Sequence, residues 1–493
     1  MARGITSDII LVLAPPWGVD EPHLGLAYLA TYLKDKGYLP EIYDMNIEVF
    51  HDVYNSPLRE LWKSSRQPDW MNRSVFYSQT VPRLESHLEQ GVNSILKNRT
   101  KTIGFSVTAS NRLFTLEMIR RIKERDRSRF IIVGGIGCYT EGERLIFLPP
   151  GMVDAFVIGE GEEILVDLLD SLENKRPLAN VSGCIYWTGE GYSRGVPRPL
   201  VEHLDSIPFP TFDEFPLDLY LYGRKSFDEF TMKHTPILGS RGCVNRCAFC
   251  NDVAIWPSFR HRSARHICDE LFYESKKRNI TAFVFQDLTI NGNLLLLREM
   301  CRLFKSKLID DFRFPVRWVS NVIARKGMDH DTFTLMKNAG CHTLMFGIES
   351  GSDKVLKLMR KGYTSESAAK VLQECKRSGI AVWINLIVGF PGEGEREFLE
   401  TLCFIKENKG YIDRVQNLNI CNVVESAELQ RNAGRYGVVL PDDDMAYLHW
   451  RSVDGTNTFE ERKRRLFMLK AEIESLGICV ENMNIEGEEG KIG

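Results

Sequence analysis

The sequence predicts a two-domain α/β protein, in which a doubly wound N-terminal domain precedes a partial (β/α)6 barrel. Over the first third of the 493 residues, short apolar runs alternate with amphipathic segments, as strands alternate with helices in a parallel sheet. From residue 236 the alternation continues as six strand-then-helix units, fewer than the eight of a complete barrel. The length allows two or three domains with separate cores.

The expected strands of the first domain are short apolar runs, at residues 9–13, 41–44, 102–106, 130–133 and 155–158. Helical periodicity predicts helices at residues 24–36, 84–96, 114–123 and 162–172. Between the second and third strands, residues 51–80 form a long insertion rich in aromatic side chains. Such an insertion either covers a site or packs on the core.

Four loops follow the carboxyl ends of these strands and should converge on one crevice, because ligands of doubly wound sheets bind there. Three of the loops contain glycine, which lets a backbone approach a large ligand closely, although glycine also serves turn geometry alone. The candidate ligand-contacting residues in these loops are Pro16, Gly18, Ser106, Asn111, Gly134, Gly135, Gly137, Gly159, Glu160 and Gly161.

The barrel is expected to follow a linker with short β segments and proline-rich turns. Its strands are predicted at residues 236–240, 282–286, 317–320, 343–346, 382–386 and 415–418, with helices such as 264–277 and 331–338 between them. The expected domains are therefore residues 1–176, a linker at 177–230, the barrel at 231–440 and a small C-terminal extension at 441–493. The tail from residue 484 is rich in glycine and charge and is expected to be disordered.

The loop after the first barrel strand carries Cys243, Cys247 and Cys250 in the spacing C-x3-C-x2-C. Three thiolates that face one point suit an iron–sulfur cluster, and four irons held by three cysteines leave one iron open to a small molecule. A zinc knuckle would add a second ligand pair, and a ferredoxin a fourth cysteine close by; neither occurs at the required spacing. Three unrelated buried thiols remain the alternative.

This loop resembles the signature of the radical S-adenosylmethionine (SAM) superfamily, in which an aromatic residue, here Phe249, precedes the last cysteine. Gly-x-Glu-Ser-Gly at 347–351, the segment 355–362 and Gly-Phe-Pro-Gly-Glu at 389–393 resemble further motifs of that family. The resemblance implies a 4Fe–4S cluster that binds SAM and cleaves it reductively to a 5′-deoxyadenosyl radical. It makes Asp287, Ser320, Glu349 and Gly389 the candidates for contacts with SAM, although the two carboxylates are also suited to capping helices.

The first third of the chain resembles the cobalamin-binding domain that is fused ahead of such barrels, on residues 22–30, 133–135 and 157–162. The histidine-containing D-x-H-x-x-G signature is absent, and His23 stands in a different context. The turn at 134–138 reads GGIGC, where family members often show GG-P-H. The resemblance thus implies cobalamin without a protein imidazole on cobalt, with Asn111 and Arg112 as candidates at its lower face. A domain that retains the fold without the cofactor is the alternative.

The two resemblances together imply a cobalamin-dependent radical SAM enzyme. Its most frequent reaction is methylation of an unactivated carbon, here in an unidentified small molecule or lipid, with a flavodoxin- or ferredoxin-type electron donor. One rival is a radical rearrangement, cyclisation or carbon–carbon coupling in which cobalamin is non-methylating or absent. Another is a non-catalytic iron–sulfur electron-transfer or sensor protein, which would not need the SAM motifs.

Composition limits the setting in which the protein works. The chain has 63 Lys and Arg against 66 Asp and Glu, so no basic surface is expected to bind nucleic acid. Its 12 cysteines lie mostly as single residues in apolar segments, which predicts a reduced cytoplasmic protein without a disulfide framework. The first residues show no signal-peptide core, and no apolar run reaches the ~18 residues of a transmembrane segment.

Overall fold

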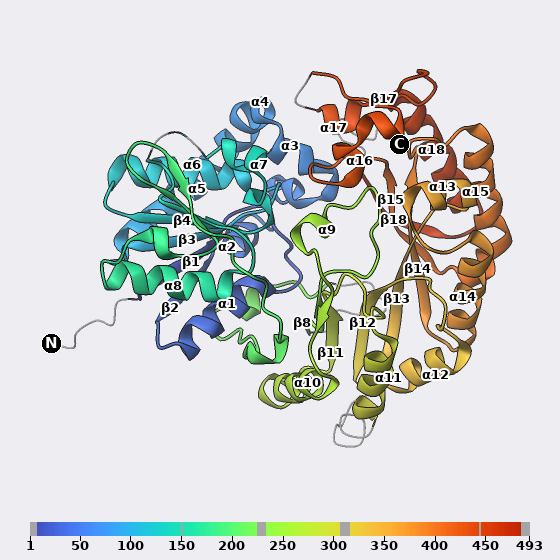
Figure 1. Ribbon diagram of the computed structural model, residues 1–493, viewed down its shortest axis with the longest axis horizontal. Coiled ribbons are helices and arrows are strands. Elements are labelled where there is room, and N and C mark those ends of the chain that lie inside the picture. Colours follow the sequence, from blue (N-terminus) through green and yellow to red (C-terminus); the bar gives the residue numbers. More distant parts are fainter. Residues whose placement is uncertain are drawn as a thin grey trace. The chain divides into compact units, whose positions relative to one another are not determined.

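The computed structural model describes residues 7–147, 149, 151–223, 233–305, 316–442 and 445–484. The chain divides into two units, Met1–Tyr222 and Gly223–Gly493. Each unit contains a seven-stranded sheet and its own hydrophobic core. The predicted α/β fold class is confirmed (Figure 1).

The first unit is a doubly wound sheet in the order β2-β1-β3-β4-β5-β6-β7. Its first five strands run parallel, whereas β6 and β7 add to the edge in antiparallel pairing. Strand order reverses between β1 and β3, and ligands of such sheets bind at this switch point. The strands are β1 (Ile9–Leu13), β2 (Pro40–Asp44), β3 (Thr102–Ser106), β4 (Phe130–Gly134), β5 (Ala155–Val157), β6 (Cys184–Trp187) and β7 (Tyr192–Arg194).

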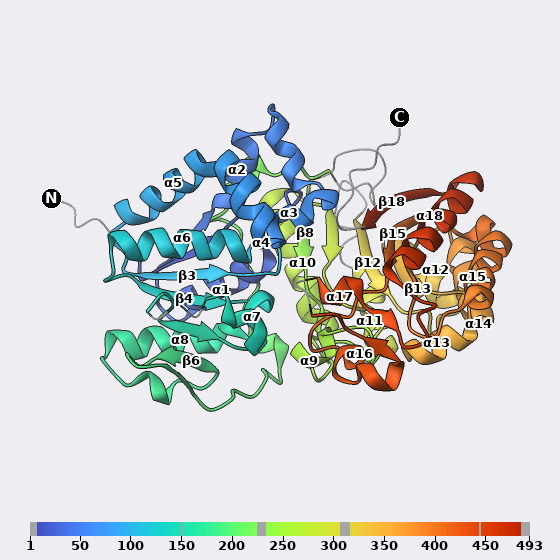
Figure 2. The same cartoon turned by 90° about the horizontal axis from the view of Figure 1, so that it is seen from above.

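Helices cover both faces of this sheet (Figure 2). Helices α5 (Val81–Lys97) and α6 (Arg112–Arg125) share one core with the sheet. Helices α1 (Leu24–Asp35) and α8 (Gly161–Glu173) share a second core on the opposite face. The remaining α-helices of the unit are α2 (Met45–Asp52), α3 (Gln67–Met71), α4 (Arg73–Val75) and α7 (Glu141–Leu145).

The aromatic insertion between β2 and β3 packs on the first of these cores. Trp70 and Phe76 are fully buried there, and the Trp70 indole Nε1 donates a hydrogen bond of 2.8 Å to the Leu61 carbonyl. Tyr54 and Tyr77 remain exposed. Trp70 and Phe76 of the insertion therefore serve packing, which is one of the two roles that their sequence context allowed.

The sheet of the second unit has seven parallel strands in the order β18-β15-β14-β13-β12-β11-β8. Six of them match the predicted strands. The strands are β8 (His234–Ile237), β11 (Ala282–Phe285), β12 (Arg317–Val322), β13 (Cys341–Glu349), β14 (Ala381–Val388), β15 (Arg414–Ile420) and β18 (Cys479–Asn484).

The seventh strand, β18, corrects the predicted count of six. It lies in the segment expected to be a C-terminal extension and pairs in parallel with β15. Its sequence, CVENMN, is too polar to read as the apolar run of a buried strand. Beyond Asn484 the tail predicted to be disordered lies outside the described residues.

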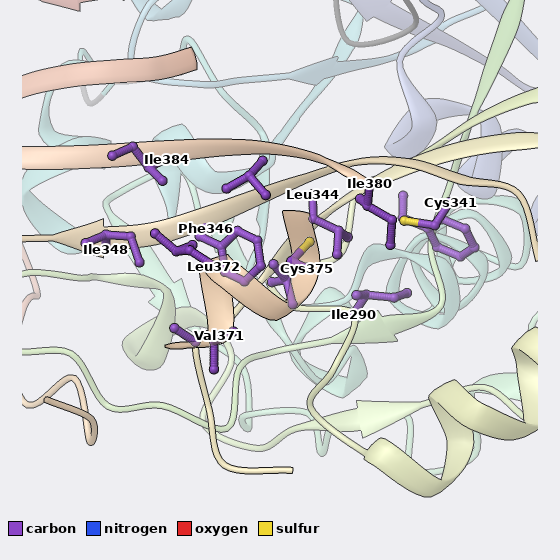
Figure 3. Packing of buried hydrophobic residues seen from close by; sticks show 14 of the residues in the cluster. Ile290, Cys341, Leu344, Phe346, Ile348, Val371, Leu372, Cys375, Ile380 and Ile384 are labelled. Atoms are coloured by element: carbon purple, nitrogen blue, oxygen red, sulfur yellow. The ribbon is translucent and has the colours of Figure 1, made fainter. Parts of the chain in front are cut away.

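Helices pack against the outer face of this sheet, where one large core lies. Figure 3 shows Leu344, Phe346 and Ile348 of β13 beside Leu372 and Cys375, two residues of the neighbouring helix. The helices of the unit are α9 (Asp252–Ile255), α10 (Ala264–Arg278), α11 (Leu294–Leu303), α12 (His330–Asn338), α13 (Asp353–Met359), α14 (Ser365–Arg377), α15 (Glu395–Asn408), α16 (Glu428–Arg431), α17 (Ala446–His449) and α18 (Phe459–Ser475).

Alternate residues of the strands face the inner side of the sheet. Met345 of β13 packs there with Val284, Val319 and Trp383 from three other strands. Because side chains alternate along a strand, Glu349, a candidate for contact with SAM, lies on the same inner side of β13 as Met345. Two short antiparallel pairs flank the sheet, β9 (Ser240–Arg241) with β10 (Arg260–His261), and β16 (Val438–Val439) with β17 (Arg451–Ser452).

Candidate functional site

The three-cysteine loop begins directly after β9 and is fixed by its own backbone. The Ala248 amide donates to the Met359 carbonyl at 3.0 Å, and the Leu429 amide donates to the Ala248 carbonyl at 2.8 Å. Gly242 has a φ of 85°, and a Cβ there would overlap the Ser258 carbonyl, so the turn into the loop requires glycine. The loop is therefore held against the segment after β13 without help from its thiols.

The thiols of Cys243, Cys247 and Cys250 are half-buried and free of disulfides. Burial raises the pKa of each thiol, so metal binding would have to release their protons. Among the described residues, no three His, Cys, Asp or Glu side chains are close enough to hold a single metal ion. A cube of four irons spreads its ligands farther apart than one ion does, and three soft sulfurs on one short loop are its usual donors. The loop thus fits a 4Fe–4S cluster.

Asp287 follows β11 and is fully buried against the start of this loop. Its carboxylate accepts hydrogen bonds from the Gly239 amide at 2.8 Å and from the Ser240 hydroxyl at 2.5 Å. Burial raises the pKa of the Asp287 carboxyl to about 6, against the lowering effect of these two donors. Both of its oxygens are engaged within the protein, so the structure shows Asp287 holding the loop.

Ser320, the other candidate from the neighbouring strand, is also fully buried, and its hydroxyl donates to the Asn321 carbonyl at 3.2 Å. The structure therefore brings Asp287 close to the cysteine loop and places Ser320 on the strand beside it, since β11 and β12 are paired. Contacts of either residue with SAM stay a prediction.

Glu349 ends β13 in an unusual conformation. Its φ of 68° lies in the left-handed region, which non-glycine residues rarely adopt, and the pairing with β14 shifts register between Gly347 and Glu349. Strained residues and β-bulges of this kind cluster at functional sites, where they re-aim a side chain. The Glu349 carboxylate forms a buried ion pair with the Lys361 ammonium at 3.2 Å. Burial raises the pKa of the Glu349 carboxyl, and Lys361 opposes that rise.

Gly389 follows β14 and is held by the C-terminal segment. Its φ is 77°, and a Cβ would overlap the aliphatic stem of Arg462. The Gly389 amide donates to Glu393 at 2.8 Å, and the Asn457 side-chain amide donates to the Gly389 carbonyl at 3.0 Å. Contact with a ligand such as adenine stays a prediction, because packing inside the protein already explains the glycine.

Arg462 is fully buried and lies over the indole ring of Trp450, at 3.9 Å from the ring centroid. It donates to the side-chain oxygen of Asn457 at 3.0 Å and to the Trp450 carbonyl at 2.9 Å. In the sequence, Arg462 stands in a basic run at residues 462–465. A run of basic residues gives no sign that one of them points inward.

In the first unit, the loop after β1 is organised by the fully buried residue Asn46. The Asn46 side-chain oxygen accepts from the Trp17 amide at 2.8 Å and from the Trp62 indole at 2.8 Å. Its amide group donates to the Gly18 carbonyl at 3.3 Å. Pro16 is buried, whereas Gly18 is exposed with open space around the position of a Cβ. Gly18 therefore borders free volume at the switch point of the sheet.

Asn111, a candidate at the lower face of cobalamin, forms several hydrogen bonds within the protein. It is fully buried, and its amide nitrogen donates to the Ala14 and Ser106 carbonyls at 3.3 and 3.2 Å. Its oxygen accepts from the Thr108 amide at 2.7 Å. The Asn111 side chain thus ties the loops after β1 and β3 together, and its contact with cobalamin stays a prediction.

Two glycines of the turn after β4 are also explained by contacts inside the protein. Gly135 has a φ of 104°, and a Cβ there would lie 2.6 Å from the Val107 carbonyl oxygen. A Cβ at Gly137 would overlap the backbone of Thr108. The Gly137 amide donates to the Val107 carbonyl at 2.8 Å. These glycines let the turn pack against the loop after β3, whereas a Cβ at Gly134 would make only ordinary contact with Val157.

The loop after β5 combines one open glycine with two packed residues. Gly159 has a φ of 107° and open space around it. Glu160 accepts a hydrogen bond from the Val201 amide at 2.6 Å, and Gly161 begins α8 where a Cβ would lie 3.1 Å from Leu29 of α1. Gly18 and Gly159 are thus the two predicted loop glycines around which the structure leaves open space.

His23 serves the protein itself. Its Nδ1 accepts from the Leu26 amide at 3.1 Å and so caps α1. Burial lowers the pKa of His23 to about 4, so the imidazole is neutral at pH 7. His23 thus has a structural role in the first unit, and cobalt without a protein imidazole stays a prediction.

Comparison with known families separates the radical SAM interpretation of the cysteine loop from a zinc knuckle, a ferredoxin loop and three unrelated thiols. Residues 237–405 match the radical SAM superfamily, and residues 11–169 match the B12 binding domain; together these ranges take up more than half of the chain. The chain belongs to the radical SAM superfamily and carries a B12-binding domain. This confirms the predicted family, as well as the prediction that the chain is an enzyme. The predicted cofactor set of 4Fe–4S cluster, SAM and cobalamin is that of these two domains, while the residues that contact each cofactor stay predictions.

Individual relatives span both halves of this radical SAM protein. An uncharacterised methyltransferase of Pyrococcus horikoshii is 27% identical over 407 residues, which cover 81% of this chain and 78% of the relative. An anaerobic magnesium-protoporphyrin IX monomethyl ester cyclase of Synechocystis is 23% identical over 61% of this chain and 58% of the cyclase.

Among solved structures, the radical SAM methyltransferase TsrM of Kitasatospora setae, with cobalamin and a [4Fe-4S] cluster bound, aligns with a TM-score of 0.69 and 16% identity. The alignment covers 99% of this chain and 93% of TsrM. At this identity the likeness shows the fold. Within the described residues of the radical SAM protein, no helix combines the length and apolar character needed to cross a membrane.

Proposed function

We propose that this radical SAM protein transfers a methyl group from SAM to a carbon atom of a small molecule or lipid. One observation carries the proposal: a single chain joins a three-cysteine cluster loop to a B12-binding domain. When bound, the cluster would supply the electron that cleaves SAM, and cobalamin would carry the methyl group. The methyltransferase relative supports this reaction. A flavodoxin- or ferredoxin-type protein is the proposed electron donor.

The chain's own residues would bind and orient these groups. Cys243, Cys247 and Cys250 would ligate the cluster, and Asp287 would hold their loop through the Gly239 amide. Glu349, aimed inward by the bulge of β13, would accept hydrogen bonds from the amino group or the ribose of SAM. Gly18 and Gly159 would let cobalamin approach the switch point of the first sheet.

Radical cyclisation without methyl transfer is the second candidate, and the match to a cyclase favours it. The two reactions leave different products. A methyltransferase that uses cobalamin should form S-adenosylhomocysteine together with 5′-deoxyadenosine and should label its product from methyl-labelled SAM. A cyclase should form 5′-deoxyadenosine without labelling the product.

The test is anaerobic turnover of the reconstituted full chain with methyl-labelled SAM, a reductant and host extract, followed by mass spectrometry. Label on a carbon atom of a new product would support the proposal. Unlabelled products together with 5′-deoxyadenosine would favour cyclisation, and the absence of 5′-deoxyadenosine would contradict both reactions. Cys250→Ala should abolish SAM cleavage, whereas Cys403→Ala, which changes an exposed thiol on α15, should retain it.

A further inference from the structure

Lys361 is a buried cation beside the cysteine loop, and the activity described so far gives it no role. It lies just beyond α13, in the segment 355–362 that resembles a family motif, and only 7% of its side chain is exposed. Its ammonium lies 5.7 Å from the centroid of the Phe249 ring, between Cys247 and Cys250 in sequence. The Asn245 side-chain amide contacts the Lys361 carbonyl at 3.5 Å.

The surroundings of Lys361 join the loop to the end of β13. The ammonium pairs with the Glu349 carboxylate at 3.2 Å and would lie 3.3 Å from a Cβ on Gly347. The Tyr363 hydroxyl donates to the Gly347 carbonyl at 2.6 Å, and its ring centroid lies 5.8 Å from the same ammonium. Lys361 is therefore held in place from three sides.

The Lys361 ammonium lies beside the cysteine loop as well as beside Glu349, because it faces the ring of Phe249, the residue before Cys250. Arg246 of the same loop is also close to Cys243, but its guanidinium is exposed and bonds to the Cys243 and Pro257 carbonyls. Solvent screens an exposed charge, whereas a buried one keeps most of its effect.

We propose that Lys361 is a positioning residue whose buried ammonium sets the reduction potential of the cluster on Cys243, Cys247 and Cys250. This inference rests on the proposed cluster. A 4Fe–4S cube held by three thiolates is negatively charged, and one-electron reduction adds a further negative charge. The net charge around a cluster is one of the quantities that set its potential. A fixed positive charge nearby stabilises the reduced form, so it raises the potential and eases delivery of the electron to SAM.

A simpler role would be that Lys361 only balances Glu349. In that case its removal would act through the carboxylate, which would then take up a proton. The two roles separate when Glu349 is first replaced by Gln, because the ammonium then has no carboxylate partner in this pair. In the Glu349→Gln variant, removal of Lys361 still changes the reduction potential if its charge acts on the cluster. It leaves the potential unchanged if Lys361 only balances Glu349.

The experiment is an anaerobic redox titration of the reconstituted full chain, followed by electron paramagnetic resonance of the reduced cluster without SAM. We expect the midpoint potential of Glu349→Gln to be higher than that of the wild type. The midpoint potential of Glu349→Gln/Lys361→Met should be lower than that of Glu349→Gln. The expected difference between them is at least tenfold in the reduction equilibrium, about 59 mV for one electron. Lys361→Arg, which keeps the charge, should stay near the wild-type potential.

Two matched controls test whether the effect depends on place and burial. Lys354→Met removes an ammonium of α13 that pairs with Glu397 away from the loop, and it should leave the potential unchanged. Arg246→Gln removes the exposed cation of the loop and should shift the potential less than the loss of Lys361. Equal potentials for Glu349→Gln and Glu349→Gln/Lys361→Met, with the cluster present in both, would overturn the inference. A wild-type chain that held no cluster would instead contradict the proposed function.

Discussion

Asp287 is the residue whose buried contacts most directly constrain the cysteine loop. In Asp287→Asn the amide group can accept only at one atom, so either the Gly239 amide or the Ser240 hydroxyl loses its acceptor. A buried donor left unsatisfied costs roughly 1–3 kcal/mol, which should loosen the loop. We therefore expect a lower iron and sulfide content per chain after anaerobic reconstitution of Asp287→Asn.

Asp269→Asn is the control for this substitution, because Asp269 pairs with Arg265 on the exposed side of α10. It should load iron as the wild type does. Full iron content in Asp287→Asn, with SAM affinity reduced, would show that Asp287 serves SAM and not the loop.

Gly18 offers a sharper test of cobalamin binding than the glycines of the turn after β4. Valine at Gly135 would collide with the Val107 backbone and disturb the unit even without a ligand. Gly18 has open space and no left-handed φ, so Gly18→Leu should fold normally. We expect Gly18→Leu to lose at least tenfold in affinity for hydroxocobalamin, measured by absorbance after desalting, with an unchanged thermal midpoint of the free protein.

Gly191→Leu provides the comparison within the same unit, since Gly191 is also open but lies in the hairpin between β6 and β7. It should retain cobalamin. Equal retention by both variants would place the cofactor away from the loop after β1.

At the scale of single elements, the junction of β2 and α2 carries a buried acid. Asp44 caps α2 by accepting from the Ile47 amide at 3.0 Å, and it accepts from the Tyr220 hydroxyl at 2.5 Å. Burial raises the pKa of Asp44 from 3.8 to about 6, in spite of both donors. The folded state therefore keeps a proton that the unfolded state releases between about pH 4 and pH 6, so this contribution to stability is present at low pH and is lost as the pH rises.

Asp44→Asn removes that titration while its amide oxygen keeps the helix cap. Relative to the variant, the wild type should lose up to about 3 kcal/mol of stability between pH 4 and pH 7. The measurement is the urea midpoint of both proteins across this range. A constant difference between them would contradict the raised pKa of Asp44.

Sequence periodicity is enough to predict most elements, because buried parallel strands such as β1 and β3 are plain apolar runs. It fails for β18, whose polar residues at Glu481 and Asn482 hide an edge strand. Cysteine spacing likewise predicts the cluster loop. It cannot show which polar groups form hydrogen bonds within the protein, as the Asn111 side chain does between the loops after β1 and β3.

Lys361 was missed as a functional candidate for a related reason. Basic residues are usually exposed, and only tertiary structure shows that this ammonium is buried beside Glu349 and Phe249. The motif that contains it was the signal available in the sequence.

At the scale of the whole molecule, each unit has its own core and its own predicted cofactor. A ligand stabilises the unit that binds it, by about 2.7 kcal/mol at a free concentration 100-fold above its dissociation constant. We expect calorimetry of the full chain to show two unfolding transitions, of which hydroxocobalamin raises one. Gly18→Leu should remove that shift, and a single transition that moves as a whole would contradict independent units.

The pairing of β18 with β15 also matters for how the protein is made. Translation produces β15 well before β18, so a nascent or prematurely ended chain holds β15 as a bare edge with unpaired backbone groups. Such edges are templates for association with other chains. Chains that stop short of Cys479 should therefore aggregate, even though the whole cluster loop and every predicted SAM contact have already been synthesised.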